Sequence, residues 1–188
     1  MKKSFIKRSL VALTFALAVA VMIPAAGSVE AQAAKKVTAQ KNYKKAKAVK
    51  TGTTVVTVKK RSRKNYYQDN YVKFKAPKTG TYVFTVSSFK ENGKKSDFSG
   101  CGGLTISKLS NNYPMALDVK TQGGKTRYLN VGTKQMYQFS VKNGEKKVDQ
   151  YLTKRTATLK LKKGETVYLD MFFTTSKMYT YQLNIKRK

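Results

Sequence analysis

The stretch DNYVKFKAPKTGTYVFTV, residues 69–86, alternates apolar and polar side chains on both sides of a turn that contains Pro and Gly. Every second residue from Val72 to Ala76 is apolar, and the same holds from Tyr82 to Val86. A period of two is typical of a β-strand with one buried face. Proline and glycine favour the backbone angles of tight turns. The stretch therefore predicts two strands separated by the turn at residues 77–80.

Other segments repeat this alternation and are also separated by turn residues. The further strands are predicted at residues 137–141, 157–161 and 179–185, with turns at residues 91–93, 123–124, 143–144 and 163–165. Short strands at this spacing indicate an antiparallel sandwich or barrel. A folded part of about 135 residues is large enough for one domain. We therefore expect an all-β chain with a single antiparallel domain over residues 52–188.

The N-terminus has the three parts of a secretory signal. Positive residues come first, the uncharged stretch Leu10–Ile23 follows, and Ala31-Gln32-Ala33 forms a small-residue cleavage site. We expect residues 1–33 to be removed and the mature chain to begin at Ala34. No later segment has the about 20 apolar residues of a membrane-spanning helix. The sequence thus predicts a protein that a Gram-positive bacterium secretes and that is held at the cell wall without a covalent anchor.

Positive charge dominates the mature chain. The full sequence has 39 Lys and Arg, 9 Asp and Glu, and a net charge of +30. No acid occurs between Glu30 and Asp69. Residues 34–51 are rich in lysine and poor in apolar groups, so we expect a disordered basic arm rather than a stable helix. Such a charge steers a protein toward anionic surfaces.

The densest basic stretch is KKRSRKNYY, residues 59–67, in which five cations precede two tyrosines. Its candidate contact residues for a polyanion or glycan are Lys59, Lys60, Arg61, Arg63, Lys64, Tyr66 and Tyr67. Cations beside aromatic rings suit single-stranded nucleic acid in a cytoplasmic protein. For an exported chain, the expected partners are instead an anionic polysaccharide, teichoic acid or an anionic membrane surface.

The order of residues from Asp69 to Tyr82 also resembles a known family. The Asp, Tyr and Phe of the first strand, the Pro/Gly turn and the following G-x-Y strand resemble the bacterial pre-peptidase C-terminal domains and related secreted jelly-roll sandwiches. The closing segments TLKLKKGETVYLDMFF and YTYQLNIKRK are similar to the last strands of that fold. The resemblance covers roughly residues 53–188. It implies a jelly-roll-like sandwich that assists binding or secretion and carries no catalytic motif.

Catalytic chemistry has few candidate residues. The chain has no His, which excludes Ser-His-Asp and Cys-His pairs and histidine-based zinc sites. The single Cys101 cannot form a disulfide within the chain, and we expect it to be buried and structural. The eight acids of the mature chain contain no calcium-loop spacing, so no metal or cofactor is predicted. Paired carboxylates for glycoside hydrolysis require spatial proximity, which a sequence does not give.

The 12 tyrosines have two interpretations. Those in alternating strands, such as Tyr82, Tyr179 and Tyr181, are expected to fill the core with their hydroxyl groups reaching water. Those at segment edges, such as Tyr71 and Tyr113, could expose a ring to a sugar. The sequence therefore favours a cationic, non-enzymatic binding module. A secreted effector acting on other cells or a host is the alternative, and an extracellular hydrolase a remote one.

Overall fold

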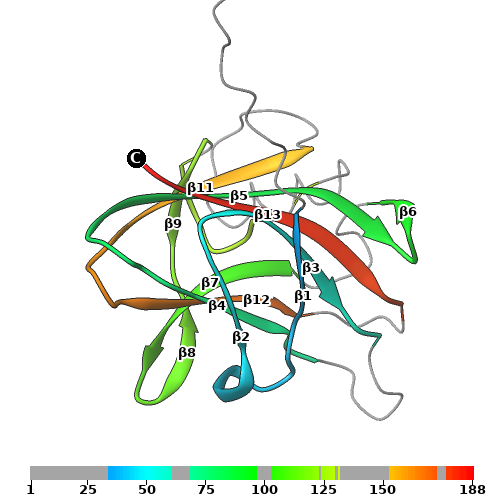
Figure 1. Ribbon diagram of the computed structural model, residues 1–188, viewed down its shortest axis with the longest axis horizontal. Coiled ribbons are helices and arrows are strands. Elements are labelled where there is room, and N and C mark those ends of the chain that lie inside the picture. The colour runs from blue at the N-terminus through cyan, green and yellow to red at the C-terminus, as the bar shows by residue number, and fades with distance from the viewer. Residues whose placement is uncertain are drawn as a thin grey trace, which may run out of the picture. The chain divides into compact units, whose positions relative to one another are not determined.

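The computed structural model describes residues 34–60, 68–96, 103–122, 124–129, 131, 153–172 and 177–188. In these ranges the chain is an all-β sandwich of two sheets that pack against each other (Figure 1). The predicted signal peptide, Cys101 and the strand expected at residues 137–141 lie outside the described residues. No helix in the described ranges has the length and apolar character needed to cross a membrane.

The larger sheet forms the upper layer of Figure 1. Its strands, in spatial order, are β1 (Lys35–Thr38), β3 (Gly52–Val58), β13 (Tyr179–Arg187), β5 (Gly80–Glu91), β11 (Lys154–Leu161), β9 (Val119–Thr121) and β10 (Gly124–Thr126). A short strand, β6 (Lys94–Lys95), pairs with the end of β5. The C-terminal β13 lies between β3 and β5, so the two ends of the described chain meet in one sheet.

The smaller sheet forms the lower layer. Its spatial order is β2 (Lys47–Val49), β4 (Tyr71–Lys75), β12 (Thr166–Phe172), β7 (Gly103–Ser110) and β8 (Tyr113–Ala116). The pairs β4–β12, β12–β7 and β7–β8 are antiparallel. Asp170 lies in register with Tyr71 on one side and with Thr105 on the other. This register decides which side chains share the outer face of the sheet.

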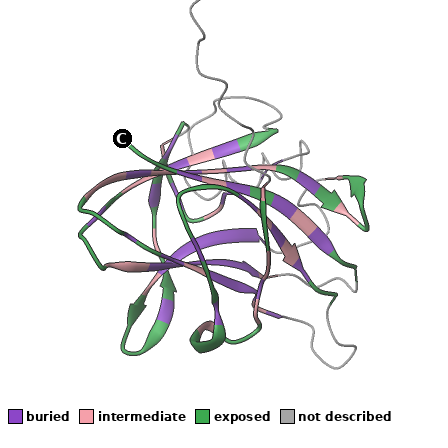
Figure 2. Cartoon of the chain, in the orientation of Figure 1, coloured by how far each residue is buried: buried purple, intermediate pink, exposed green. Residues whose placement is uncertain are grey.

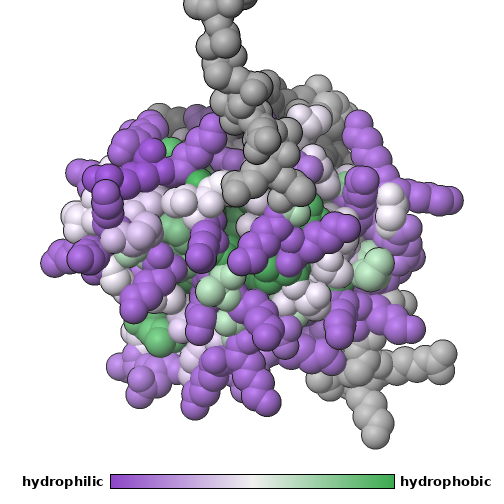
Figure 3. All heavy atoms as spheres, viewed as in Figure 1, coloured by the Kyte–Doolittle hydropathy of each residue, from purple (hydrophilic) through white to green (hydrophobic). Residues whose placement is uncertain are grey.

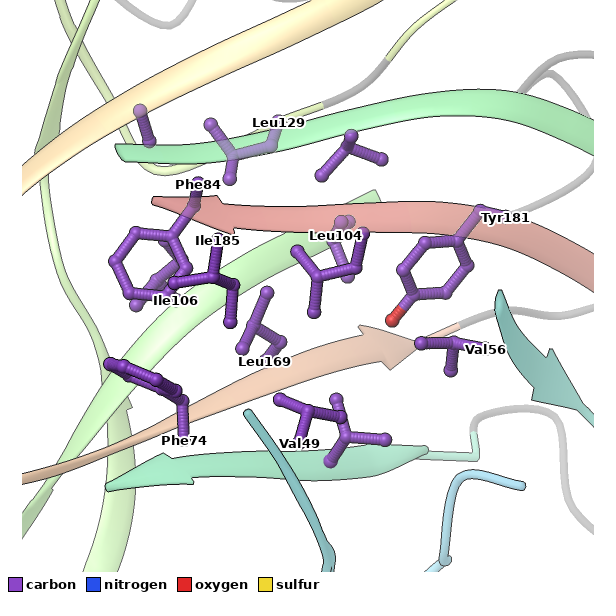
Figure 4. Packing of buried hydrophobic residues seen from close by; sticks show 14 of the residues in the cluster. Val49, Val56, Phe74, Phe84, Leu104, Ile106, Leu129, Leu169, Tyr181 and Ile185 are labelled. Atoms are coloured by element: carbon purple, nitrogen blue, oxygen red, sulfur yellow. The ribbon is translucent and has the colours of Figure 1, made fainter. Parts of the chain in front are cut away.

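The core lies between the sheets and uses the alternation predicted from the sequence (Figures 2 and 4). The predicted inward positions on β4, β5 and β13 are all buried, including Phe74, Phe84 and Ile185. Each apolar side chain of this size contributes about 1.5–3 kcal/mol when fully buried. The inward strand faces therefore supply the main stabilisation of the fold.

The tyrosine prediction is confirmed for the rings but wrong for the hydroxyl groups. Tyr82, Tyr179 and Tyr181 are at most 1% exposed. The hydroxyl of Tyr82 donates to the carbonyl oxygen of Lys78 at 2.6 Å and so fixes the turn between β4 and β5. The Tyr181 ring points between the sheets (Figure 4), and its buried hydroxyl has no partner among the described residues. Core packing of the rings thus takes priority over solvation of their oxygens.

The expected disorder of residues 34–51 is wrong, and so is the expectation of purely antiparallel sheets. Strand β1 pairs in parallel with β3, and β2 pairs in parallel with β4. Between them, η1 (Tyr43–Lys45) forms a single 3-10 turn. Ala39, Ala46 and Val49 are buried, so a few apolar side chains anchor this lysine-rich segment. The lysines of β1 and β2 stay exposed, which avoids the cost of burying charge.

The Val49→Ala substitution tests whether this segment is part of the folded domain. Val49 is 3% exposed and belongs to the main apolar core. We expect its truncation to lower the free energy of unfolding by about 2 kcal/mol, because two buried methyl groups are lost. Urea denaturation measures the change. Lys47→Ala, at an exposed position of the same strand, is the control, and its free energy of unfolding should stay within about 0.5 kcal/mol of that of the parent. Equal stability of the parent and the Val49→Ala variant would contradict the pairing of β2 with the sheet.

Candidate functional site

Two of the seven predicted contact residues are described. Lys59 and Lys60 follow β3 directly and are exposed. Arg61, Arg63, Lys64, Tyr66 and Tyr67 lie outside the described residues. Of the two described lysines, Lys59 lines a pocket of about 360 Å³.

This pocket, here called the lysine pocket, brings together cations from two segments. Lys41 and Lys45 come from the loop after β1, and Lys59 comes from the end of β3. The other lining residues are Ala39, Gln40, Asn42 and Asn70. No acid lines the lysine pocket within the described part of the chain. Three ammonium groups beside amide side chains form a site suited to an anion, since lysine and amide N–H groups are donors.

The position of the lysine pocket follows from backbone bonds at its base. The Ala39 N–H donates to Thr57 in the larger sheet, at 2.9 Å. The next residue, Gln40, exchanges two backbone bonds with Tyr71 in the smaller sheet. The side-chain oxygen of Asn42 then accepts from the Lys44 N–H at 2.9 Å and caps the 3-10 turn. The loop that carries the two lysines is thus held at both ends and in its middle.

The same loop places Tyr43 on the outer face of the smaller sheet. The Tyr43 ring lies edge-on to the rings of Tyr71, Tyr113 and Tyr168, with centroid separations of 5.9–6.1 Å. We call these four residues the tyrosine cluster. Its Tyr43 hydroxyl donates to the carbonyl oxygen of Asn112. Edge-to-face packing of rings adds about 0.5–1.5 kcal/mol per pair to the burial of their area.

A second pocket, of about 200 Å³, lies next to the tyrosine cluster. We call it the tyrosine–aspartate pocket. Its walls come from the start of β4, from β7, β8 and β12, and from the segment after β10. The lining residues are Asp69, Tyr71, Thr105, Ser107, Tyr113, Pro114, Ala116, Arg127, Tyr128, Asp170 and Phe172. The pocket thus combines carboxylates, hydroxyl groups, one guanidinium and aromatic rings.

Two carboxylates converge on this pocket from segments that are 101 positions apart in the sequence. Asp69 accepts a hydrogen bond from the Tyr71 hydroxyl at 3.0 Å. Oδ1 of Asp170 accepts from the backbone N–H of Asn70 at 2.9 Å. Asp170 is 8% exposed. Burial, and secondly the charge of Asp69, raise the pKa of Asp170 to about 7. Burial also raises the pKa of the Tyr71 hydroxyl, which remains protonated and donates.

Asn70 links the two pockets. It lines the lysine pocket, while its backbone N–H holds Asp170 in the tyrosine–aspartate pocket. Its side-chain nitrogen donates to the carbonyl oxygens of Gln68 and Met171, at 2.9 and 3.0 Å. Asn70 is 1% exposed, so these bonds are sheltered from water. The two pockets therefore lie on either side of one rigid, buried residue.

A third pocket, beside the turn between β11 and β12, differs because an acid lines it together with Lys108, Lys160 and Lys162. Glu165 binds both the Lys108 ammonium group and the Lys162 backbone N–H. The hydrogen bond from Lys108, with that from Lys162, lowers the pKa of Glu165. The charge of Glu165 offsets part of the positive charge of these lysines, so this pocket suits an anion less well than the lysine pocket does.

The charges of the described residues are distributed unevenly. Most of the described lysines are exposed, and many hydrophilic side chains project from the face seen in Figure 3. The described acids are Asp69, Glu91, Asp118, Glu165 and Asp170. Three of these acids pair with Lys or Arg. The other two are the carboxylates of the tyrosine–aspartate pocket, so the described acids without a salt bridge meet at one place. Clusters of three or more potential metal ligands are absent from the described part.

The sequence analysis names Lys59 as a candidate contact residue but assigns Lys41 and Lys45, which line the same pocket, to a disordered arm. It also names Tyr71 and Tyr113 as rings that could be exposed: Tyr113 is 54% exposed, and Tyr71 is buried. Asp69 and Asp170 were considered only as two acids among eight. Their proximity depends on the register of β12 with β4, for which the sequence holds no local signal.

Comparison with protein-family models and with curated protein sequences finds no match to this chain. The two pockets are therefore interpreted from their own residues.

The Asp170→Asn substitution tests the buried carboxyl group. Its pKa is about 7 in the folded chain, well above the ordinary Asp value of 3.8, so the unfolded chain loses this proton first. The free energy of unfolding should then fall as the pH rises from about 4 to 7, by an amount on the order of 4 kcal/mol from this group. Asn cannot ionise and keeps an oxygen that can accept from Asn70, so the variant should lack this fall.

Urea denaturation of the parent and the variant at pH 4, 5.5 and 7.5 measures the difference. Glu165 has a lowered pKa and acts in the opposite direction, with stability that is lost below its unfolded pKa. It is present in both proteins, so the difference between them isolates Asp170. Parallel pH profiles for the two proteins would contradict the assignment.

Proposed function

We propose that this protein is a secreted, strongly cationic, non-enzymatic binding module that is retained on anionic polymers outside the cell. The observation that carries the proposal is the convergence of Lys41, Lys45 and Lys59 on a pocket without a described acid. Phosphate or carboxylate groups of a wall polymer or glycan are the expected ligands. This pocket gives a defined contact, whereas lysines spread over the sheets give only long-range attraction.

The proposal also includes the basic stretch that begins at Lys59. Lys60 is exposed beside it, and the stretch continues with Arg61, Arg63 and Lys64. We propose that these side chains extend the contact of the lysine pocket along the polymer. The chain has no His, which is consistent with a role that requires no general base of that type. The pre-peptidase C-terminal resemblance, as a hypothesis, points to the same class of secreted accessory domain.

A second candidate function is an extracellular hydrolase, which one observation favours. Asp69 and Asp170 line the same pocket, and the pKa of Asp170 is raised to about 7. A carboxyl group whose pKa is raised toward neutrality, beside a second carboxyl group, is the pairing used in glycoside hydrolysis. Release of reducing ends from a polysaccharide by the parent protein, and not by the Asp170→Asn variant, would establish this alternative.

A triple substitution of the pocket lysines tests the binding proposal. Replacing Lys41, Lys45 and Lys59 with Gln should weaken binding to teichoic acid or heparin. The slope of log affinity against log salt should fall in magnitude by about two to three, because each lost ion contact releases about one counterion fewer. Isothermal titration at several salt concentrations measures both effects.

The matched control replaces Lys94, Lys95 and Lys186 with Gln. All three are exposed and none of them lines a described pocket. The control changes the net charge by the same amount, so it separates the pocket from the overall field. Equal losses in the two triple variants would show that net charge alone holds the polymer and would contradict a role for the lysine pocket.

The basic stretch requires its own variant. Neutralising Lys60, Arg61, Arg63 and Lys64 while Lys59 is kept should lower affinity further in the background of the pocket variant. Exposed charges are screened within about 10 Å at 0.1 M ionic strength, so the effect should be largest at low salt. Tyr66→Ala with Tyr67→Ala should reduce binding at unchanged stability if the rings stack on sugars. Unchanged affinity of the four-charge variant would make the stretch a solvated connector.

A further inference from the structure

We propose that the tyrosine–aspartate pocket binds a neutral, hydroxyl-bearing sugar ring. This second site rests on observations separate from the lysine pocket, and it gives the proposed binding module a specific contact beside its electrostatic one.

The first observation is a pair of hydroxyl-bearing residues on one wall of the pocket. Thr105 and Ser107 on β7 line the pocket, and the residues are 5% and 3% exposed. A hydroxyl group can donate and accept, so both can bond to a polar ligand that enters the pocket. An apolar ligand would shield them from water without replacing that hydration, at a cost of about 1–3 kcal/mol per group. These two residues therefore favour a polar ligand.

The second observation is the mixture of donors and acceptors around these hydroxyl groups. Asp69 and Asp170 offer carboxyl oxygens, and Arg127 offers guanidinium N–H groups while it pairs with Asp118 at 2.9 Å. The bond from Asn70 engages only Oδ1 of Asp170. A sugar hydroxyl both donates and accepts, so a polyhydroxylated ring can satisfy acids, hydroxyls and a guanidinium at the same time.

The aromatic walls match the other property of a sugar, its apolar C–H faces. Tyr113 is 54% exposed and borders the pocket, and the Tyr128 and Phe172 rings lie 6.4 Å apart at another wall. The pocket volume of about 200 Å³ is below the about 300–1,000 Å³ of drug-sized clefts. A single ring therefore fits the size of the site better than an extended ligand does.

Charge favours a neutral ring over a cationic one. An ammonium group could bind the carboxylates, but Arg127 lines the same pocket, and the chain has a net charge of +30. The long-range field of the protein repels a cation. Asp170 with its raised pKa also carries only part of a charge near neutral pH. An anionic group would in turn meet Asp69, so neutral hydroxyl groups suit the pocket.

The turn between β7 and β8 holds this site in place. Asn111 and Asn112 both have positive φ, 49° and 59°, which is the backbone of a two-residue hairpin turn. Tyr113 follows immediately, and the Tyr43 hydroxyl bonds the carbonyl oxygen of Asn112. The exposed Tyr113 ring is therefore positioned before any ligand arrives, which lowers the entropic cost of binding.

A nuclear magnetic resonance titration tests the inference with defined probes. Methyl glucoside and methyl N-acetylglucosaminide are added to the ¹⁵N-labelled protein, and glucosamine serves as the cationic comparison. At least one neutral glycoside should produce saturable amide shifts confined to β7, β8, β12 and residues 127–129. The expected affinity is in the millimolar range, as for a small ligand with few contacts.

Two variants connect the shifts to the pocket. Thr105→Val combined with Ser107→Ala should weaken binding about tenfold, as the loss of two net hydrogen bonds implies. Tyr113→Ala should also weaken it, and it keeps the test valid if the double variant is poorly folded. Ser110→Ala, an exposed residue on the same strand, is the matched control and should bind like the parent.

Three results would overturn the inference: no saturable shift with either neutral glycoside, shifts with glucosamine only, or unchanged affinity in both the double variant and Tyr113→Ala. The lysine-pocket variant distinguishes these failures from a failure of the proposed function. It should bind the neutral glycoside like the parent while it loses affinity for the polyanion. Polyanion binding that persists in that variant would contradict the lysine pocket and leave the sugar result unaffected.

Discussion

The crossing of the chain from one sheet to the other at Ala39 and Gln40 is the constraint on which both pockets depend. Ala39 bonds to β3 in the larger sheet, and Gln40 bonds to Tyr71 at the start of β4 in the smaller one. These contacts require no particular side chain, because they join backbone groups that would otherwise remain unpaired. They nevertheless decide where Lys41, Lys45 and Tyr43 are placed. Without the crossing, this lysine-rich segment would bury too few apolar side chains to offset the conformational entropy that it loses on ordering.

Asn70 transfers this order to the acidic side of the structure. Its side-chain nitrogen and its backbone N–H donate to three different groups, and the residue is 1% exposed. Hydrogen bonds to a charged or partly charged acceptor are stronger than bonds between neutral groups, at about 1.5–3 kcal/mol. Asp170 remains unfavourable as an anion despite this bond, because burial and Asp69 oppose its charge. A chain with few acids that places two of them together departs from the most stable arrangement, and such departures are typical of functional sites.

The sequence predicted what strand periodicity controls and missed what long-range pairing controls. Alternation identified the inward faces of β4, β5 and β13, whose predicted inward residues are all buried, and of β11, where Ala157 and Leu161 are buried and Leu159 is partly buried. Strands β1 and β2 were missed because they are short and rich in lysine, and because parallel pairing with β3 and β4 has no local sequence signal. Lys59 could be named as a candidate contact residue from charge density alone. The register of β12 with β4 brings Asp69 and Asp170 to one pocket. The crossing of the chain between the sheets brings Lys59 and Lys41 to the other.

Charge and shape then have separate roles in the proposed recognition. Lysines on the solvent-exposed faces of the strands are close to interchangeable, so they attract any polyanion and discriminate poorly between polyanions. Selectivity requires polar groups that are fixed in position and that lose hydrogen bonds when the wrong ligand binds. The lysine pocket meets the first condition through its backbone anchors. The tyrosine–aspartate pocket meets both, since its polar groups are carried on strands, and a ligand without hydroxyl groups would shield Thr105, Ser107 and Asp170 from water without replacing that hydration. For this reason a polymer that carries both anionic groups and neutral sugar rings fits the two pockets better than a simple polyanion does.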